Sequence, residues 1–82
     1  VDAEALRRTE NLDRREAIRT VLDALPDTLR IPLLLRDLDG MSYQEIADDL
    51  GIGLSATKMR IKRARERFRE LYDGSVAMEA RS

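Results

Sequence analysis

The side chains that most often carry chemistry in proteins are missing from this chain of 82 residues, which contains no histidine and no cysteine. Their absence removes the most common general base, the usual metal ligands and any disulfide framework. The carboxylates Asp48 and Asp49 are adjacent on a predicted helix, so they point in different directions and do not form a catalytic pair. We therefore predict a binding domain rather than an enzyme, without a metal or other cofactor.

Basic residues are the remaining candidates, and they gather near the end of the sequence. The formal net charge is −1, yet residues 1–50 carry seven basic and twelve acidic side chains, whereas residues 51–82 carry eight basic and four acidic ones. The stretch from Lys58 to Arg69 alone holds seven basic residues and one glutamate. A domain polarised in this way can present one basic face to phosphates while its mean charge stays near zero.

The basic stretch is predicted to lie on one side of a helix. At 100° per residue, apolar positions form a stripe, and the basic residues cover the surface that the stripe leaves free. Lysine and arginine donate to guanine O6 and N7, Met59 offers only apolar contact, for example to a thymine methyl group, and Ser55 can hold a phosphate at the helix N-terminus. The stripe consists of Leu54, Thr57, Ile61, Ala64 and Phe68. The residues expected to contact DNA are Ser55, Lys58, Met59, Arg60, Lys62, Arg63 and Arg67.

The element that must position this face is a short helix just before it. Ser42 and Glu45 form the capping-box pattern S-x-x-E, and Gly51 is expected to end the short helix. Ser55 is expected to cap the long basic helix, which reaches about residue 72. A short capped helix, a glycine turn and a long basic helix are the layout of a helix-turn-helix, whose second helix enters the major groove of DNA.

Two more helices are predicted upstream. Asn11 or Asp13 can cap the first, and Pro26 ends it because the residue before a proline resists the helical conformation. The second is expected to start at Asp27 or Thr28.

The second helix contains a proline and is rich in leucine. If Thr28 is its cap, Pro32 lies at the fourth helical position, where a proline is tolerable. The helix is expected to end at Asp39, with Gly40 as the left-handed residue that stops it. Because it is apolar almost all round, it is either deeply buried or covered by a partner. The expected partner-binding residues are Ile31, Leu34, Leu35 and Leu38.

The predicted fold class is all-α, a four-helix domain whose C-terminal helix-turn-helix has a winged-helix-like three-helical core without a wing. Hydrophobic residues make up 43% of the chain but aromatic ones only 4%, so the core must be aliphatic. No apolar run approaches the roughly 18 residues that span a membrane, and no signal peptide is visible. We therefore expect a soluble, cytoplasmic domain.

The expected domain boundaries follow from the same patterns. Residues 1–10 are predicted to be a linker or a frayed helix, and residues 11–72 one domain with the helix-turn-helix at 42–72. Asp73-Gly74 is expected to break the last helix, which leaves residues 73–82 as a loose tail.

From Leu22 to Tyr72 the sequence resembles domain four of a bacterial extracytoplasmic-function (ECF) sigma factor, in the sigma-70 family. The resemblance rests on LDALPDTLRIPLLLRDLDGMSYQEIADDLGIG followed by SATKMRIKRARERFREL, which combine a leucine-proline segment, a leucine–arginine run, G-x-S-Y-x-E-I-A and R-A-R-E-R. It implies binding to the minus-35 promoter element through the last helix, binding to the flap of the RNA polymerase β subunit, a role in transcription initiation, and control by an anti-sigma factor.

The resemblance also implies roles for individual residues. Lys58, Met59, Lys62 and Arg63 would face the bases, whereas Arg60 and Ser55 would contact the DNA backbone. Two departures from the family pattern stand out: Ser55-Ala56-Thr57 replaces the usual Gly-Thr-Val, and Met59 stands where the family often has serine.

Two other functions are compatible with these patterns. The first is the DNA-binding domain of a response regulator, which shares the helix-turn-helix but does not bind the polymerase flap. The second is a protein-docking module whose apolar second helix binds a regulator. A pull-down with the flap separates the first from the sigma-type domain, and salt-dependent DNA affinity separates the second.

Overall fold

The computed structural model describes residues 2–81, with side chains described up to Gly74. Within that range the chain forms four helices and no strand, which confirms the all-α class. The helices are α1 (Ala3–Ala24), α2 (Asp27–Asp37), α3 (Tyr43–Leu50) and α4 (Leu54–Arg81).

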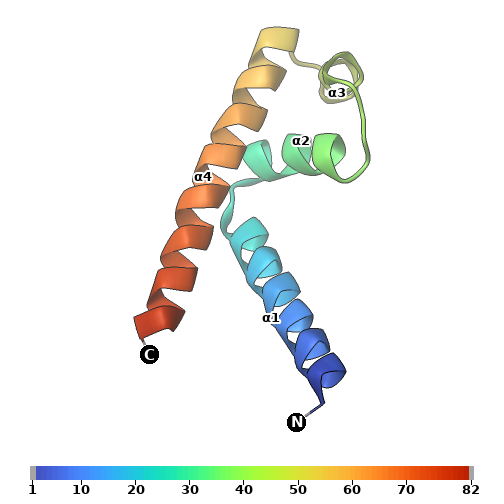
Figure 1. Cartoon of the computed structure of the whole chain (residues 1–82). Coiled ribbons are helices and arrows are strands. Elements are labelled where there is room, and N and C mark those ends of the chain that lie inside the picture. The colour runs from blue at the N-terminus through green and yellow to red at the C-terminus, as the bar shows by residue number, and fades with distance from the viewer. Residues whose placement is uncertain (1, 82) are drawn as a thin grey trace.

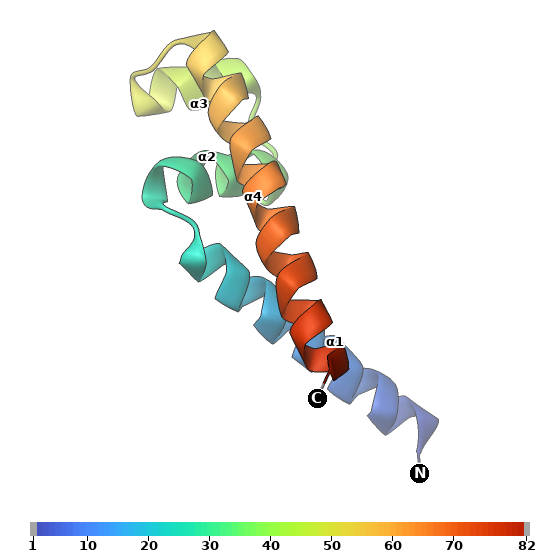
Figure 2. The same ribbon diagram turned by 90° about the vertical axis from the view of Figure 1, so that its left-hand side faces the viewer.

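The long helix α4 organises the molecule. Both views show α3 beside the first turns of α4 and α2 across its middle, while α1 runs away from α3 toward the opposite end (Figures 1 and 2). The molecule is elongated, with a longest extent of 52 Å. The chain therefore presents α3 and the start of α4 at one end, far from its N-terminus.

A small aliphatic core lies between α4 and the other three helices. Its central residues are Leu25, Leu33, Ile46, Ile61 and Ala64, none more than 6% exposed. The one buried polar side chain, among those described, is Thr57. Its hydroxyl donates to the carbonyl of Gly53 at 3.0 Å, so its polar atom is satisfied within the first turn of α4.

The first helix is longer than predicted. It begins at Ala3 rather than near Asn11 or Asp13, because the Asp2 carboxylate caps it by accepting the backbone N–H of Glu4 at 3.0 Å. Side chains from Asp2 to Glu16 are all exposed, so this half of α1 is helical without packing on the core. Val1, also expected in a linker or frayed helix, lies outside the described residues.

The start of α2 also differs from the prediction. Neither Asp27 nor Thr28 is the cap; Pro26 is, and its carbonyl accepts from the N–H groups of Leu29 and Arg30 at 3.0 and 2.9 Å. Pro32 therefore lies at the sixth helical position, inside α2, and it is buried. The helix ends at Asp37, two residues earlier than expected, and the loop turns at Gly40, whose φ of 69° confirms its predicted left-handed conformation.

One arginine fixes the junction between α1 and α2. The guanidinium of Arg30 donates to the carbonyls of Leu22 and Leu25, at 3.4 and 3.0 Å, and forms an ion pair with Asp27. These carbonyls belong to the end of α1, where a cation is favourable. These contacts tie the end of α1 to α2 across the two residues, Leu25 and Pro26, that separate the helices.

The turn between α3 and α4 is built as predicted. Gly51 has a φ of 66°, and the N–H of Ile52 donates to the carbonyl of Ala47 at 3.0 Å, which is a Schellman-type helix end. The long helix then starts at Leu54 rather than after a Ser55 cap, because the carbonyl of Gly53 accepts the first helical N–H, from Thr57.

Replacing Gly51 by alanine is expected to destabilise the fold by about 1–2 kcal/mol, the penalty of a left-handed conformation for a residue with a Cβ atom. An added Cβ would meet no atom within 4 Å, so backbone strain is the whole effect. Chemical denaturation measures it, and Gly53→Ala is the matched control, because Gly53 has equal space and no positive φ. Equal losses in the two variants would contradict this explanation.

The predicted end of α4 is wrong. The helix continues through Asp73 and Gly74 to Arg81. In the described chain, positive φ angles occur only at Gly40 and Gly51, so Gly74 keeps a helical backbone and does not terminate the helix. A glycine inside a helix lowers its stability by about 1 kcal/mol relative to alanine, but that alone does not end it. Ser82, the last residue of the expected tail, lies outside the described residues.

Candidate nucleic-acid interface

The start of α4 presents a polar and basic surface away from the core. Thr57, Ile61 and Ala64 are buried against the other helices, as the predicted stripe requires. Leu54 departs from the stripe, because its side chain is 39% exposed. On the opposite side, five of the residues expected to contact DNA are exposed: Ser55, Lys58, Met59, Lys62 and Arg63. We call these five residues the α4 outer face.

Two other residues expected at the interface lie differently. Arg60 is half-buried beside the core stripe rather than on the α4 outer face. Arg67 is exposed, and its guanidinium forms an ion pair with Glu70 at 3.2 Å. Surface pairs of this kind contribute little to stability, so Arg67 can exchange Glu70 for a phosphate at small cost.

A basic hollow lies beside the α4 outer face, where α3 begins. It has a volume of about 320 Å³ and is lined by Tyr43, Lys58, Ile61, Lys62, Arg65, Glu66 and Arg69. The Tyr43 ring is held by two cations, with the Arg36 Cζ atom 4.5 Å and the Lys58 Nζ atom 5.9 Å from its centre. The hollow is favourable for phosphate oxygens because four of its lining residues are cations, Lys58, Lys62, Arg65 and Arg69.

Sequence reasoning missed Arg65 and Arg69 as members of this surface. Together with Lys58 and Lys62 they are spaced four, three and four residues apart, so they form one stripe along α4. The helical wheel contained this signal. Arg65 is also anchored to α2, because its guanidinium donates to both carboxylate oxygens of Asp37, at 2.6 and 3.4 Å. The hydrogen bonds to Asp37 raise the pKa of Arg65.

The capping box at the start of α3 is confirmed and fixes the orientation of that helix. The N–H of Glu45 donates to the Ser42 hydroxyl at 3.1 Å, and the N–H of Ser42 donates to the Glu45 carboxylate at 3.0 Å. Two interactions lower the pKa of Glu45: the larger effect comes from the hydrogen bond with the Ser42 backbone, and the smaller one from the Ser42 side chain. The folded state therefore favours the ionised form of the Glu45 carboxylate.

This lowered pKa predicts a dependence of stability on pH. A group whose pKa is lower in the folded state stabilises the fold above its unfolded pKa and loses that effect as the pH falls through the folded value. Wild type is expected to melt at a higher temperature than Glu45→Gln at pH 7, and the difference should be lost as the pH falls below the ordinary titration range of a glutamate and through the lowered pKa of Glu45. Thermal melts of both proteins with and without Ser42→Ala measure it. The difference should be smaller but still present in the Ser42→Ala background, because alanine keeps the backbone N–H that donates to the Glu45 carboxylate and loses only the hydroxyl. Equal melting temperatures of wild type and Glu45→Gln at pH 7 would exclude the capping box as a source of stability.

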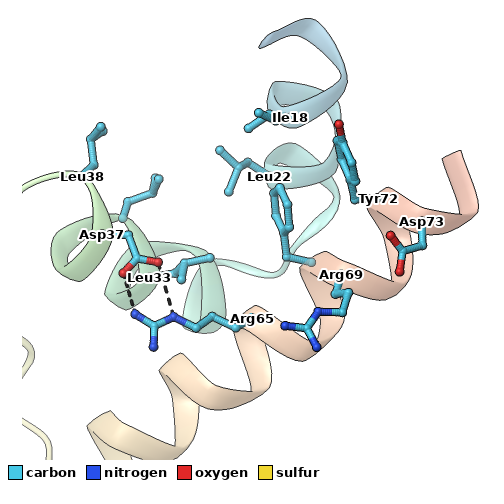
Figure 3. Close-up of a pocket in the computed structure, with 11 residues that line it drawn as sticks. Ile18, Leu22, Leu33, Asp37, Leu38, Arg65, Arg69, Tyr72 and Asp73 are labelled. Atoms are coloured by element: carbon cyan, nitrogen blue, oxygen red, sulfur yellow. Dashed lines mark hydrogen bonds and ion pairs between the residues drawn. The ribbon is translucent and has the colours of Figure 1, made fainter. Parts of the chain in front are cut away.

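An apolar groove lies at the other end of the helix cluster, where α1, α2 and α4 meet (Figure 3). Its volume is about 520 Å³, and the ion pair between Asp37 and Arg65 lies along one side. Ile18 and Leu22 of α1 lie near Tyr72 of α4 in the close-up. The apolar side chains that line it are Ile18, Leu22, Leu33, Leu34, Leu38, Phe68 and Tyr72. We call it the α1–α2–α4 groove.

The residues expected to bind a partner are only partly brought together. Leu34 and Leu38 line the α1–α2–α4 groove, and Leu38 is 77% exposed. Ile31 is exposed elsewhere on α2, and Leu35 packs against the core. The groove residues from α1 and α4 were missed, because their contribution depends on how distant helices meet.

The geometry defines the class of protein. An eight-residue capped helix, a turn through a left-handed glycine and a long helix with a basic outer face form a helix-turn-helix. Residues 15–68 match the family described as sigma-70, region 4, and the chain belongs to this family.

Similar proteins confirm the expected resemblance to ECF sigma factors. The chain is 36% identical over 63 residues to RNA polymerase sigma factor SigZ of Bacillus subtilis, an alignment that covers 77% of this chain and 36% of that protein. It is 41% identical over 61 residues to the ECF RNA polymerase sigma-E factors of Escherichia coli and Salmonella typhimurium, covering 70% of this chain and 32% of each of them. The chain thus spans about a third of the length of these relatives.

None of the helices that the structure describes is both long enough and apolar enough to span a bilayer.

Proposed function

We propose that this domain recognises the minus-35 element of promoters, as part of a sigma factor that directs RNA polymerase to initiate transcription in the cytoplasm. It acts by binding, not by catalysis. The observation that carries the proposal is the α4 outer face, where basic side chains are exposed on a helix that is held at its start by a capped helix and a glycine turn. Membership of the sigma-70 region 4 family supports the same function.

The distribution of charge supports DNA as the ligand. Lys58, Lys62 and Arg63 are exposed within two turns, near the N-terminus of the helix that would enter the major groove. In this proposal Lys62 and Arg63 face base edges, where they can donate to guanine O6 and N7. The basic hollow beside Tyr43 would contact phosphates on one side of the groove, and Arg67 would contact phosphates on the other side. Ser55 and Arg60 remain our proposed backbone contacts.

The test is a binding measurement with selected and scrambled DNA. Duplexes with a randomised central segment are enriched on the 82-residue chain, and the affinity of the selected duplex is then measured over a range of salt concentrations. We expect the logarithm of the association constant to fall linearly with the logarithm of the salt concentration, with a slope of about −0.9 for each phosphate contact. The selected duplex should bind tighter than a scrambled one at every salt concentration. No enrichment and no salt dependence would refute promoter recognition.

We also propose that the α1–α2–α4 groove binds the flap of the RNA polymerase β subunit. The groove is apolar and open to solvent at Leu38, and charged residues line its rim, as is typical of a groove that takes an apolar helix face. Control by an anti-sigma factor follows as part of the proposal, since a protein that covers this groove would exclude the polymerase. The DNA-binding domain of a response regulator, the alternative function, would not bind the flap.

Leu38→Ala is expected to weaken flap binding by about 1–2 kcal/mol, because the partner would remove the exposed leucine side chain from water, which stabilises a complex by about 0.8 kcal/mol for each buried methylene group. It should change the free energy of unfolding by no more than about 0.5 kcal/mol, since Leu38 is already 77% exposed. Titration of the isolated flap with each variant measures the affinity. Leu12→Ala is the matched control, because Leu12 is 62% exposed on α1 outside the groove. Equal affinities of the two variants would place the flap elsewhere.

A further inference from the structure

We propose that Met59 selects a thymine at one position of the DNA site, by contacting the 5-methyl group of that base in the major groove. The inference rests on the proposed function, because it takes α4 to be the helix that enters the groove. It adds the identity of one base that the domain reads and the side chain that reads it.

Met59 is the sixth residue of α4, within the part of a recognition helix that reaches base edges. Its neighbours Thr57 and Ile61 are buried in the core, whereas the Met59 side chain is 46% exposed. Ser55 and Arg63, one turn before and after it, are exposed as well. Met59 therefore stands at the centre of the α4 outer face.

Met59 differs in its surroundings from the other exposed apolar residue described on α4. Among the side chains described on this helix, the large exposed apolar ones are Leu54 and Met59. On the helical wheel Leu54 lies on the same side as Ile61, next to the core. Met59 lies on the opposite side, among Lys58, Lys62 and Arg63, where packing within the domain does not explain an apolar side chain.

The major-groove edges of the bases differ in what a methionine side chain can contact. A methionine thioether donates no hydrogen bond and accepts only weakly, so it leaves guanine O6 and N7 or cytosine N4 unpaired when it covers them. Thymine is the base that carries an apolar methyl group on its major-groove edge. Methionine is also unbranched and flexible, so it can adjust to that methyl group. Met59 thus favours thymine and disfavours a G·C pair.

The test begins with selection from duplexes that have a randomised central segment, using wild type, Met59→Ala and Met59→Gln. Wild type is expected to select thymine at one position, and Met59→Ala to lose that preference while it keeps the others. Met59→Gln has a similar length but a polar end that pairs with adenine N6 and N7. It should move the preference toward adenine at the same position.

A change of one methyl group in the DNA then isolates the contact. Replacing the selected thymine by deoxyuracil should weaken wild-type binding roughly fourfold, as expected for the loss of one buried methyl group. Met59→Ala should bind the two duplexes equally. With cytosine at that position, adding a 5-methyl group should strengthen wild-type binding and leave Met59→Ala unchanged. Deoxyuracil at another thymine of the site is the matched control.

The outcomes separate this inference from the proposed function. If the chain selects a sequence but deoxyuracil has the same effect on wild type and Met59→Ala, Met59 does not read the methyl group and promoter recognition stands. If the three proteins select the same base at every position, the inference is also overturned. If wild type selects no sequence at all, both the inference and the proposed function fail.

Discussion

Replacing Lys62 and Arg63 together by alanine is expected to weaken binding to the selected duplex by about 2–4 kcal/mol, which is roughly a thirtyfold to thousandfold rise in Kd. Each residue is exposed on the α4 outer face, and a good base contact contributes about 1–3 kcal/mol. The two effects should not add fully, because adjacent residues share partners. Binding to scrambled DNA should fall much less, so the preference for the selected sequence is lost.

The matched control removes the same charge at the other end of the molecule. Arg7 and Arg8 are exposed and adjacent on α1, near the N-terminus and far from α3 (Figure 1). Arg7→Ala with Arg8→Ala should leave the sequence preference intact and change affinity only through net charge. If both double variants lose affinity equally for selected and scrambled DNA, the effect is long-range electrostatics, and the assigned reading face is wrong.

The helix-turn-helix was predictable because its signals are local. Ser42 and Glu45 form a pattern three residues apart, and both hydrogen bonds are present. Gly51 stops a helix through its own backbone angle, and the burial of Thr57, Ile61 and Ala64 repeats with the helical period. Each signal depends on residues within one or two turns, so no knowledge of the tertiary structure was needed.

The long ends of α1 and α4 were not predictable from the same signals. Hydrophobic periodicity reports which face is buried, and residues 3–16 of α1 bury no side chain, so the helix leaves no periodic pattern there. Gly74 is followed by more helix because a glycine ends a helix only where the chain takes the left-handed conformation, as at Gly51. Composition alone does not indicate which of the two occurs.

The α1–α2–α4 groove depends on packing between helices that are distant in sequence. Because α2 is apolar almost all round, the sequence predicted that part of its surface would bind a partner. Which of its residues face outward depends on the angles at which α1 and α4 cross α2. Leu35 turned inward to the core and Leu38 outward, although both are leucines of one helix. Arg30 and Asp37, which bind α1 and α4 respectively, help to set those angles.

Replacing Ile46 by alanine is expected to destabilise the domain by about 2–5 kcal/mol, the usual range for removing a buried isoleucine side chain. Ile46 has no exposed surface and packs in the core with Ile61 and Ala64. A domain of this size is stable by only about 4–12 kcal/mol, so one truncation removes a large part of its stability. Because α3 buries only Ile46 and Ala47, the same change should also loosen the helix-turn-helix and weaken sequence-specific DNA binding.

Ile31→Ala is the control for the same chemical change on an exposed residue. Ile31 is 43% exposed on α2, so its truncation should change the free energy of unfolding by no more than about 0.5 kcal/mol and leave DNA binding as in wild type. Urea denaturation of the three proteins gives both differences, provided that the slope with denaturant is unchanged. A loss of about 2 kcal/mol for Ile31→Ala would mean that this face of α2 is covered in solution. A small loss for Ile46→Ala would mean that α3 does not rest on the core, and the α4 outer face would then lack the support on which promoter recognition depends.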